Sequence, residues 1–544
     1  MIPLIQNNFI DGTFKITDIM VQLQKRLFHA SGKVQALVLV LLGALAASAF
    51  PPIHLTILLI PAFVALFWLV DAAVTFKGAF RVGWLFGVGH FASGFYWVGH
   101  AFLVDAARYG WMAPFAVLGL AMGLALFVGL VAVVSKYVFK QMQVDVYGRT
   151  VILAVVWISV EWVRGWVLTG FPWNQIGSVW ANLDIMMQFA SIGGVLGLGL
   201  VTLIAALLPA GLAYTKEPES RRYLPVVGFA LLVCVAGFGV LRLSGAKMDV
   251  VHAVKLRLVQ PNISQDLKWK PDLRLGHVRS LIKLSAQKFE GVPPPTHIIW
   301  PETAVPYDLQ HDINLLNVLG KTAPIGGALI TGAPRSSGPK AIKPEYWNSF
   351  LAILPGGKID AIYDKIHLVP FGEYIPWRIV LKFTKLTEGR SDFSVGQLPR
   401  ILKVTGLPAF APLICYEAIF AHEVRTLGIQ PRWLLNITND AWFGQSSAPY
   451  QHLAAVQFGS IEMGLPLVRV ANTGISAMID PYGRILAQLA LDSEGILDVD
   501  LPEALKSQTL YGRFGDAIVA LMMIVCVGFA TVGSAVGRVR KAAK

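Results

Sequence analysis

The stretch PLICYEAIF, from Pro412 to Phe420, places a thiol where a short apolar run ends. The run before Cys415 has the length and composition of a buried strand, and Tyr416 and the carboxylate of Glu417 follow at once. A cysteine here is either a small hydrophobic residue of the core or a nucleophile at a strand end. The second interpretation needs a base and a group that stabilises negative charge elsewhere in the chain.

Two other apolar runs in the same region end in groups of the required types. The run HIIWP leads directly to Glu302, and YDKIHLVPFGEYIP places Lys365, His367 and Glu373 around a short apolar run. Glu302, Lys365 and Cys415 lie far apart in sequence, so each comes from a separate element. Catalytic groups have this distribution when a sheet gathers several loops at one edge.

The composition of the chain indicates a membrane protein. Of its 544 residues, 55% are hydrophobic and only 15% are charged, and the mean hydropathy is +0.58. In soluble domains, roughly a quarter of all residues are charged. The formal net charge of +13 is concentrated beside apolar segments, which favours lipid headgroups and topology signals over nucleic acid. The three cysteines, Cys234, Cys415 and Cys526, imply no disulfide framework.

Eight apolar runs have about the length that a helix needs to cross a bilayer, roughly 20 residues. Seven precede the Cys415 region and one follows it, and the first and fifth are short. We expect spans near residues 33–49, 54–74, 79–103, 112–135, 150–167, 188–213, 222–241 and 514–537. Residues 1–32 are polar and mixed, and we expect a cytoplasmic extension there.

The charges beside these runs predict the orientation of the bundle, because short cytoplasmic loops collect Lys and Arg. Only Arg108 and Arg164 lie in the short loops of one side. The other side holds many more, namely Lys25, Arg26, Lys33, Lys77, Arg81, Lys136, Lys140, Arg149, Lys216, Arg221, Arg222, Arg538, Arg540, Lys541 and Lys544. Both termini are therefore predicted to be cytoplasmic, and the segment between the last two spans is predicted to lie outside.

That segment, residues 246–510, has the composition of a soluble α/β domain. Strand-like runs recur at residues 254–262, 297–304, 328–334, 349–357, 411–420, 432–440 and 465–483. Helical patterns lie between some of them, at residues 272–289 and 452–462. The alternation predicts a layered α/β domain with buried sheets.

Four motifs of this domain, WPE, DK.H.VPFGEY, CYE and TNDAWFG, resemble those of the nitrilase superfamily. With seven spans before the domain and one after it, the chain resembles the apolipoprotein N-acyltransferase family, as does the loop TGFPWNQIG at residues 169–177. The resemblance implies a multi-pass α-helical membrane bundle of eight helices joined to an αββα nitrilase-like sandwich. Residues 33–245 would form seven helices, 246–510 the sandwich, and 511–544 the eighth helix and a cytoplasmic tail, with residues 1–32 outside the resemblance.

The resemblance also implies a role for each residue of the motifs. Glu302 would act as general base, Lys365 would stabilise an oxyanion and help to hold the thiolate, and Cys415 would be the nucleophile. His367 would be structural, although residue types alone also allow a Cys–His dyad. The supporting residues would be Glu373, which orients Lys365, then Tyr416 and Glu417 after the nucleophile, and Trp269.

The same resemblance implies the substrates and the location. The sn-1 acyl chain of a phospholipid, with phosphatidylethanolamine as the expected donor, would pass through a Cys415 thioester to the N-terminal amine of a diacylglyceryl-cysteine apolipoprotein. The enzyme would be a monomer of the bacterial inner membrane with a periplasmic catalytic domain, and it would need no cofactor. Trp442, Phe443 and Phe371 are candidates to line an acyl entry, although packing beneath loops explains them equally well.

Metal and nucleotide sites are not indicated. His422 and His452 have no ligand spacing, and Cys415 lacks a second thiol or a His pair. The GLGLGL stretch at residues 195–200 lies in an apolar run and predicts helix packing.

Two other functions remain open at this point. A membrane-anchored nitrilase-type amidase or hydrolase would use the same residues and pass the acyl group to water. The other is a transporter or scaffold whose outer domain is inactive. His90, His100 and Glu161 in the spans are few and fit hydrogen-bond partners inside the bundle, although ionisable residues within a membrane are often functional. An intact Glu–Lys–Cys set argues against the scaffold.

Overall fold

The computed structural model describes residues 2–142, 144–214, 223–338, 343–376, 392–397, 401–425 and 431–542. The chain forms two compact units. The helical unit comprises Met1–Tyr96, Pro114–Ser244 and Phe514–Lys544, and the sheet unit comprises Trp97–Ala113 and Gly245–Arg513. Lys216, Arg221, Arg222 and Lys544, which the predicted orientation uses, lie outside the described residues.

Three helices of the helical unit begin at residues whose side chains cap them. Ser31, Thr75 and Asp145 accept hydrogen bonds from backbone N–H groups three residues later, which satisfies donors that a helix start leaves unpaired. The main helices are α1 (Ile2–His29), α2 (Gly32–Ala47), α3 (Leu59–Ala72), α4 (Phe76–Gly94), α7 (Ala113–Met142), α8 (Val146–Arg164), α10 (Ala190–Leu207), α11 (Leu224–Ser244) and α18 (Asp516–Ala542).

Helices α2 and α4 pack closely because glycines lie at their contact. A Cβ atom on Gly43 would lie 2.0 Å from the carbonyl oxygen of Phe86, and one on Gly89 would lie 1.9 Å from that of Val40. Small residues allow backbones to approach in this way in membrane bundles. The GLGLGL stretch lies within α10, as its apolar surroundings predicted.

Each of the eight predicted spans coincides in part with a helix of this unit. Within the described part of the chain, four helical stretches are long and apolar enough to cross a membrane, namely Ala106–Met142, Val146–Arg164, Ala190–Ala213 and Leu224–Ser244. Gly32–Ala47, Thr56–Ala72 and Asp516–Val532 are shorter apolar helices. Helix α4 is in neither group, so the count of eight spans stays a prediction.

The third predicted span, residues 79–103, ends earlier than its hydropathy suggested. Helix α4 stops at Gly94, and the chain continues through short turns, among them η2 (Tyr96–Gly99), α5 (His100–Leu103) and α6 (Ala106–Tyr109). Trp97 is buried, and its indole Nε1 donates a hydrogen bond to Gln451 Oε1 at 3.1 Å within the sheet unit. The Trp97 side chain therefore packs against protein, and a hydropathy pattern cannot distinguish such packing from contact with lipid.

The sheet unit contains two mixed sheets. The first has the order β11-β1-β2-β3-β4-β5, and the second has the order β10-β9-β8-β7-β6. Strands β1, β2 and β3 run parallel, as do β6, β7 and β8, and the other neighbours are antiparallel. The strands are β1 (Val250–Gln260), β2 (His297–Ile299), β3 (Ala328–Ser336), β4 (Tyr346–Ile353), β5 (Ile359–Asp364), β6 (Phe410–Ile414), β7 (Trp433–Thr438), β8 (Leu467–Ala471), β9 (Ser476–Ile479), β10 (Ile485–Leu489) and β11 (Gly495–Pro502).

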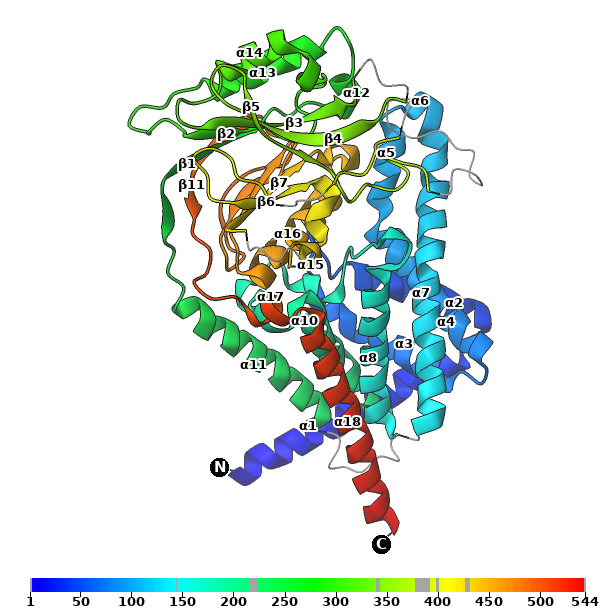
Figure 1. Ribbon diagram of the computed structural model, residues 1–544. Coiled ribbons are helices and arrows are strands. Elements are labelled where there is room, and N and C mark those ends of the chain that lie inside the picture. The colour runs from blue at the N-terminus through cyan, green and yellow to red at the C-terminus, as the bar shows by residue number, and fades with distance from the viewer. Residues whose placement is uncertain are drawn as a thin grey trace. The chain divides into compact units, whose positions relative to one another are not determined.

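The two sheets pack face to face, and helices cover their outer faces (Figure 1). Helices α13 (Arg274–Ser285) and α14 (Ile313–Gly320) pack on the first sheet, and α16 (Ala448–Met463) packs on the second. This is the αββα layering that the resemblance implied. The alternation along β1 shows its origin, since Leu256 and Leu258 enter the core between the sheets while Val259 packs with α13.

We expect Phe410→Ala to destabilise the sheet unit strongly. Phe410 is fully buried between the sheets, with its ring centroid 4.5 Å from Trp433 of β7 and 5.8 Å from Phe350 of β4. Truncating such a side chain lowers the free energy of unfolding by about 3–5 kcal/mol, which thermal unfolding of the purified protein measures. Phe289→Ala is the control, because Phe289 is 50% exposed and its loss should cost less than about 0.5 kcal/mol. Equal effects of both changes would contradict this packing.

Candidate active site

The ends of three strands bring the three predicted residues together. Glu302 follows β2, Lys365 follows β5 and Cys415 follows β6, so two come from the first sheet and one from the second. The Nζ atom of Lys365 lies 3.7 Å from Oε1 of Glu302. Cys415 is close enough to interact electrostatically with both of these charges. The sequence-based grouping of these residues therefore agrees with their positions in the fold.

Lys365 is held by a second carboxylate, that of Glu373. Its Nζ lies 3.0 Å from Glu373 Oε1 and 2.9 Å from Oε2, and the Lys365 side chain is 1% exposed. Burial alone would lower the pKa of Lys365, but the charges of Glu373 and Glu302 outweigh it and raise that pKa. The ammonium is thus positively charged at neutral pH and fixed in direction, as Glu373 was expected to ensure.

Two further residues fix the carboxylate of Glu302, and neither was predicted. Nδ2 of Asn348, on β4, donates to Glu302 Oε1 at 2.6 Å and to Glu373 Oε1 at 2.8 Å, so one amide links both acids. Gly332, on β3, allows the backbone of the segment that carries Glu302 to approach the backbone of β3. A Cβ atom there would lie 2.5 Å from the backbone nitrogen of Thr303 and 2.7 Å from the Cα of Glu302.

Cys415 lies at a sharp turn between β6 and a short 3-10 helix, Cys415–Ile419. Its φ of 51° is in the left-handed region, which non-glycine residues adopt at a cost that the surrounding structure must compensate. Nδ2 of Asn436 donates to the carbonyl oxygens of Leu413 at 3.0 Å and of Cys415 at 3.4 Å, which supports the turn. The thiol side chain stays partly exposed.

The surroundings of Cys415 favour the protonated thiol, although Lys365 was expected to help to hold the thiolate. Burial raises its pKa first and the charge of Glu302 raises it further, whereas Lys365 and a hydrogen bond with Thr438 lower it less strongly. Lys365 therefore favours the thiolate but does not maintain it at neutral pH. Attack by the sulfur would then require a base that removes the proton during the reaction, and the Glu302 carboxylate is near enough to interact electrostatically with the thiol.

Glu417 is buried and has a structural role. Its Oε1 accepts hydrogen bonds from the Tyr363 hydroxyl at 2.8 Å and from the backbone N–H groups of Ile366 at 2.8 Å and His367 at 3.1 Å. Its Oε2 accepts from the N–H of Ile414 at 2.7 Å. This one side chain joins the turn that carries Cys415 to the segment that carries Lys365.

His367 does not face the thiol as a dyad would require. Its Nδ1 lies 2.9 Å from Glu423 Oε1, and its ring stacks on Phe420 with centroids 3.8 Å apart and contacts Tyr416 edge-on at 5.6 Å. The imidazole is thus engaged with the short helices after Cys415. This geometry supports the structural role implied by the family pattern.

A buried charged network lies beneath Cys415, and the sequence did not single it out. Asp440 accepts from Thr438 Oγ1 at 2.8 Å and lies 2.5 Å from Arg469 Nη2 and 3.1 Å from His452 Nδ1. Burial would raise the pKa of Asp440, but Arg469 and His452 outweigh it and lower that pKa. The TND motif, read only as a family signature, was the available signal.

Trp269 and the three acyl-lining candidates have weaker structural support. Trp269 accepts hydrogen bonds from Arg274 through its carbonyl oxygen at 3.0 and 2.9 Å, and the Arg274 guanidinium lies 5.8 Å from the centroid of its ring. Phe371 is 48% exposed. Trp442 is partly exposed, and Phe443 packs edge-on against Trp97 at 4.7 Å. Their predicted roles remain predictions.

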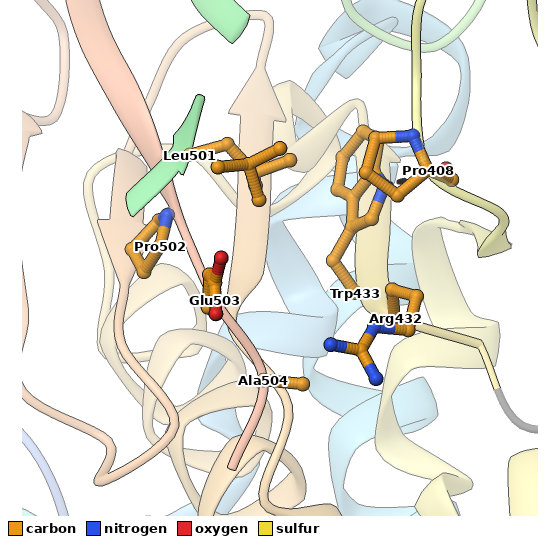
Figure 2. A pocket seen from close by; sticks show the side chains of 8 residues that line it. Pro408, Arg432, Trp433, Leu501, Pro502, Glu503 and Ala504 are labelled. Carbon is orange, nitrogen blue, oxygen red and sulfur yellow. Dashed lines mark hydrogen bonds between the residues drawn. The ribbon is translucent and has the colours of Figure 1, made fainter. Parts of the chain in front are cut away.

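The described residues contain no group of three His, Cys, Asp or Glu side chains that could hold a metal ion. A hollow of about 130 Å³ lies at the other end of the strands, before β6 and β7. Figure 2 shows Leu501 and Pro502 on one side of it and Pro408 with Trp433 on the other. Its residues come from strand ends opposite to those that carry Cys415, so it is separate from the candidate active site.

We expect alkylation of Cys415 by iodoacetamide to accelerate continuously with pH. Because its pKa is raised above the ordinary 9.0, the thiolate fraction keeps growing through that pH, and the rate should reach no plateau below it. Peptide mass spectrometry measures the rate at Cys415 separately from the rates at the other cysteines. Lys365→Met should slow alkylation by at least about tenfold, since a pKa shift of one unit has that effect. Exposed Lys358→Met is the matched control. A plateau near neutral pH would contradict a protonated resting thiol.

Comparison with known proteins assigns both parts of the chain. Residues 42–208 match the family described as the apolipoprotein N-acyltransferase N-terminal domain, and residues 255–509 match the carbon–nitrogen hydrolase family. Among solved structures, an amidase from Nesterenkonia sp. AN1 has a TM-score of 0.34 and 19% identity, covering 47% of this chain and 93% of the amidase. Nit3 of Saccharomyces cerevisiae has a TM-score of 0.33 and 16% identity, covering 46% of this chain and 90% of Nit3.

Several curated relatives are similar over nearly their whole length, and each is named apolipoprotein N-acyltransferase. The relative from Rhodopseudomonas palustris is 37% identical over 518 residues, which is 91% of this chain and 95% of the relative. Those from Bradyrhizobium diazoefficiens and Brucella suis are 39% and 36% identical, covering 91% and 94% of this chain and 94% and 98% of the relatives. The chain therefore belongs to the apolipoprotein N-acyltransferase family, and its sheet unit is a nitrilase-like domain.

Proposed function

We propose that the protein transfers the sn-1 acyl chain of a phospholipid, through a thioester on Cys415, to the N-terminal amine of diacylglyceryl-cysteine in apolipoproteins. This reaction is the last step of lipoprotein maturation, and phosphatidylethanolamine is the proposed donor. One observation carries the proposal. In a chain of this family, a partly exposed thiol lies beside a buried ammonium that two carboxylates hold.

In the first half-reaction, the sulfur of Cys415 attacks the sn-1 ester carbonyl while Glu302 takes the thiol proton. The negative charge moves to the carbonyl oxygen, where the ammonium of Lys365 stabilises it. Collapse breaks the ester C–O bond, and Glu302 returns the proton to the departing oxygen. A lysophospholipid leaves, and the acyl chain stays on sulfur.

In the second half-reaction, the neutral α-amino group of the acceptor attacks the thioester while Glu302 takes one amine proton. Collapse of the intermediate breaks the C–S bond and forms the amide, and the proton returns to the sulfur of Cys415. The raised pKa of the thiol favours this step, because the sulfur that leaves as the amide forms takes up a proton again and the free enzyme is regenerated. A transfer that proceeds in two steps through an acyl-enzyme thioester is covalent catalysis.

Residues around the triad would act through it. Glu373 and Asn348 would orient Lys365 and Glu302, and Glu417 would hold the Cys415 turn. The backbone N–H of Tyr416 would donate to the oxyanion. Trp269 would lie near the substrate, and Trp442, Phe443 and Phe371 would line the acyl entry.

The arrangement in the membrane is part of the proposal. Eight helices would cross the inner membrane, with both termini cytoplasmic and the sheet unit periplasmic. The sheet unit is joined to apolar helices at both ends, because α11 ends at Ser244 before β1 and α18 begins at Asp516 after β11. A monomer tethered in this way would keep Cys415 at the membrane surface, where the acyl chains of both substrates stay in lipid.

A membrane-anchored amidase or hydrolase is the second candidate, because residues 255–509 match the carbon–nitrogen hydrolase family. It would use the same three residues and transfer the acyl group to water. The identity of the acceptor therefore separates the two functions.

We expect the purified protein, given phosphatidylethanolamine and a diacylglyceryl lipopeptide, to form a triacylated amide and one lysophospholipid for each amide. Initial rates at varied concentrations of both substrates should give parallel double-reciprocal lines, the pattern of a ping-pong mechanism. Cys415→Ser should abolish both products, whereas Cys234→Ser, in the exposed part of α11, should not change the rates. Intersecting lines would contradict the covalent route, and free fatty acid in place of the amide would favour the hydrolase.

A further inference from the structure

A second buried lysine, Lys268, lies at the candidate active site. It ends the short helix α12 (Gln265–Lys268), its side chain is 2% exposed, and its Nζ donates a hydrogen bond to the backbone oxygen of Glu302 at 3.0 Å. Its electrostatic neighbours are the Glu302 carboxylate and the Cys415 thiol. Lys270, two residues later, is exposed. One lysine of the DLKWK segment is thus buried, and burial of a charged group always costs free energy of desolvation.

The segment that carries Lys268 is fixed from the second sheet. Nδ2 of Asn439, after β7, donates to Gln265 Oε1 at 2.8 Å. The side chain of Asn472, after β8, holds Ile263 through both of its backbone groups, at 2.7 and 3.2 Å. The side chain of Lys268 then reaches the Glu302 backbone of the first sheet. It therefore links the two sheets at the edge where the reacting groups meet.

Lys268 adds a second ammonium group to a cluster that already holds the carboxylates of Glu302 and Glu373 and the ammonium of Lys365. With a protonated thiol, the carboxylates of Glu302 and Glu373 oppose the ammonium groups of Lys365 and Lys268. When the thiol proton moves to Glu302, the negative charge moves to the substrate oxygen, and the sum stays zero. Without Lys268, Lys365 would be the one ammonium opposite the carboxylates of Glu302 and Glu373, and a low-dielectric site disfavours such an excess of negative charge.

We propose that Lys268 is a positioning residue for acyl transfer, which fixes the main chain at Glu302 and supplies a positive charge that opposes the negative charge of the site as the oxyanion forms. The inference rests on the proposed function. A lysine retained only for packing would have no such effect, because its methylene groups alone would fill the space.

Lys268 should also give the reaction an alkaline limit. Burial lowers its pKa to about 8, while Glu302 and Cys415 oppose this effect. Its charge is therefore present below that pH and lost above it. The groups that face it are Glu302, Cys415 and, across Glu302, the ammonium of Lys365, and the raised pKa values of Lys365 and Cys415 place their own titrations at higher pH.

The test compares Lys268→Met, Lys268→Arg and exposed Lys270→Met with the wild type. The readout is the burst of lysophospholipid from phosphatidylethanolamine without lipopeptide, which isolates the first half-reaction, and thermal unfolding confirms that each variant is folded. Lys268→Met should slow the burst by at least about tenfold, as loss of groups that support proton transfer does, without changing the KM for phospholipid. Lys268→Arg should retain most of the burst, and Lys270→Met should match the wild type.

The pH profile separates positioning by charge from packing. The wild-type burst rate should fall as the pH rises through about 8, and Lys268→Arg should lack this fall because arginine stays charged. If Lys268→Met equals Lys270→Met, or if folded Lys268→Arg keeps the wild-type alkaline fall, the inference is wrong. If Lys268→Met does not fold, the pH dependence of the burst rate of Lys268→Arg alone tests the inference. A wild-type protein that forms amide without any burst would instead overturn the proposed function.

Discussion

The ammonium of Lys365 lies buried between the carboxylates of Glu302 and Glu373, and the geometry of the candidate site depends on this interaction. A buried charge is stable only when it is paired, so the three side chains fix one another. The segments after β2 and β5 must consequently keep their relative positions, which Asn348 and the close approach of Gly332 also require. Glu417 extends the constraint to the second sheet, because it holds the Cys415 turn against the Lys365 segment.

Much of this site could be predicted from the sequence, because strand ends carry recognisable signals. Apolar runs that stop at Glu302 and Cys415 indicated residues at a sheet edge, and the family motifs supplied their roles. Lys268, Asn348 and the Asp440 network could not be identified in the same way. Their importance comes from burial and from partners distant in sequence, such as Asp440 with Arg469. The sequence around a single lysine or asparagine indicates neither its burial nor its distant partners.

The fold shows the same division between local and distant information. Long apolar or alternating stretches predicted helices such as α10 and strands such as β1. Strands β5, β10 and β11 were missed because they are mostly only partly buried and their residues mix apolar with charged or polar types. The segment Trp97–Ala113 was assigned to a span and its following loop, yet it packs within the sheet unit. A hydropathy pattern indicates that side chains are removed from water, but it does not show whether they contact lipid or the core of a protein.

The central claim is that Cys415 carries the acyl chain. Intact-protein mass spectrometry after incubation with phosphatidylethanolamine alone tests it most directly. The account predicts an adduct with the mass of one acyl chain on the wild-type protein, labile to hydroxylamine as a thioester is, and absent from Cys415→Ser. Absence of any adduct, under conditions where the same preparation triacylates a diacyl lipopeptide, would contradict the account.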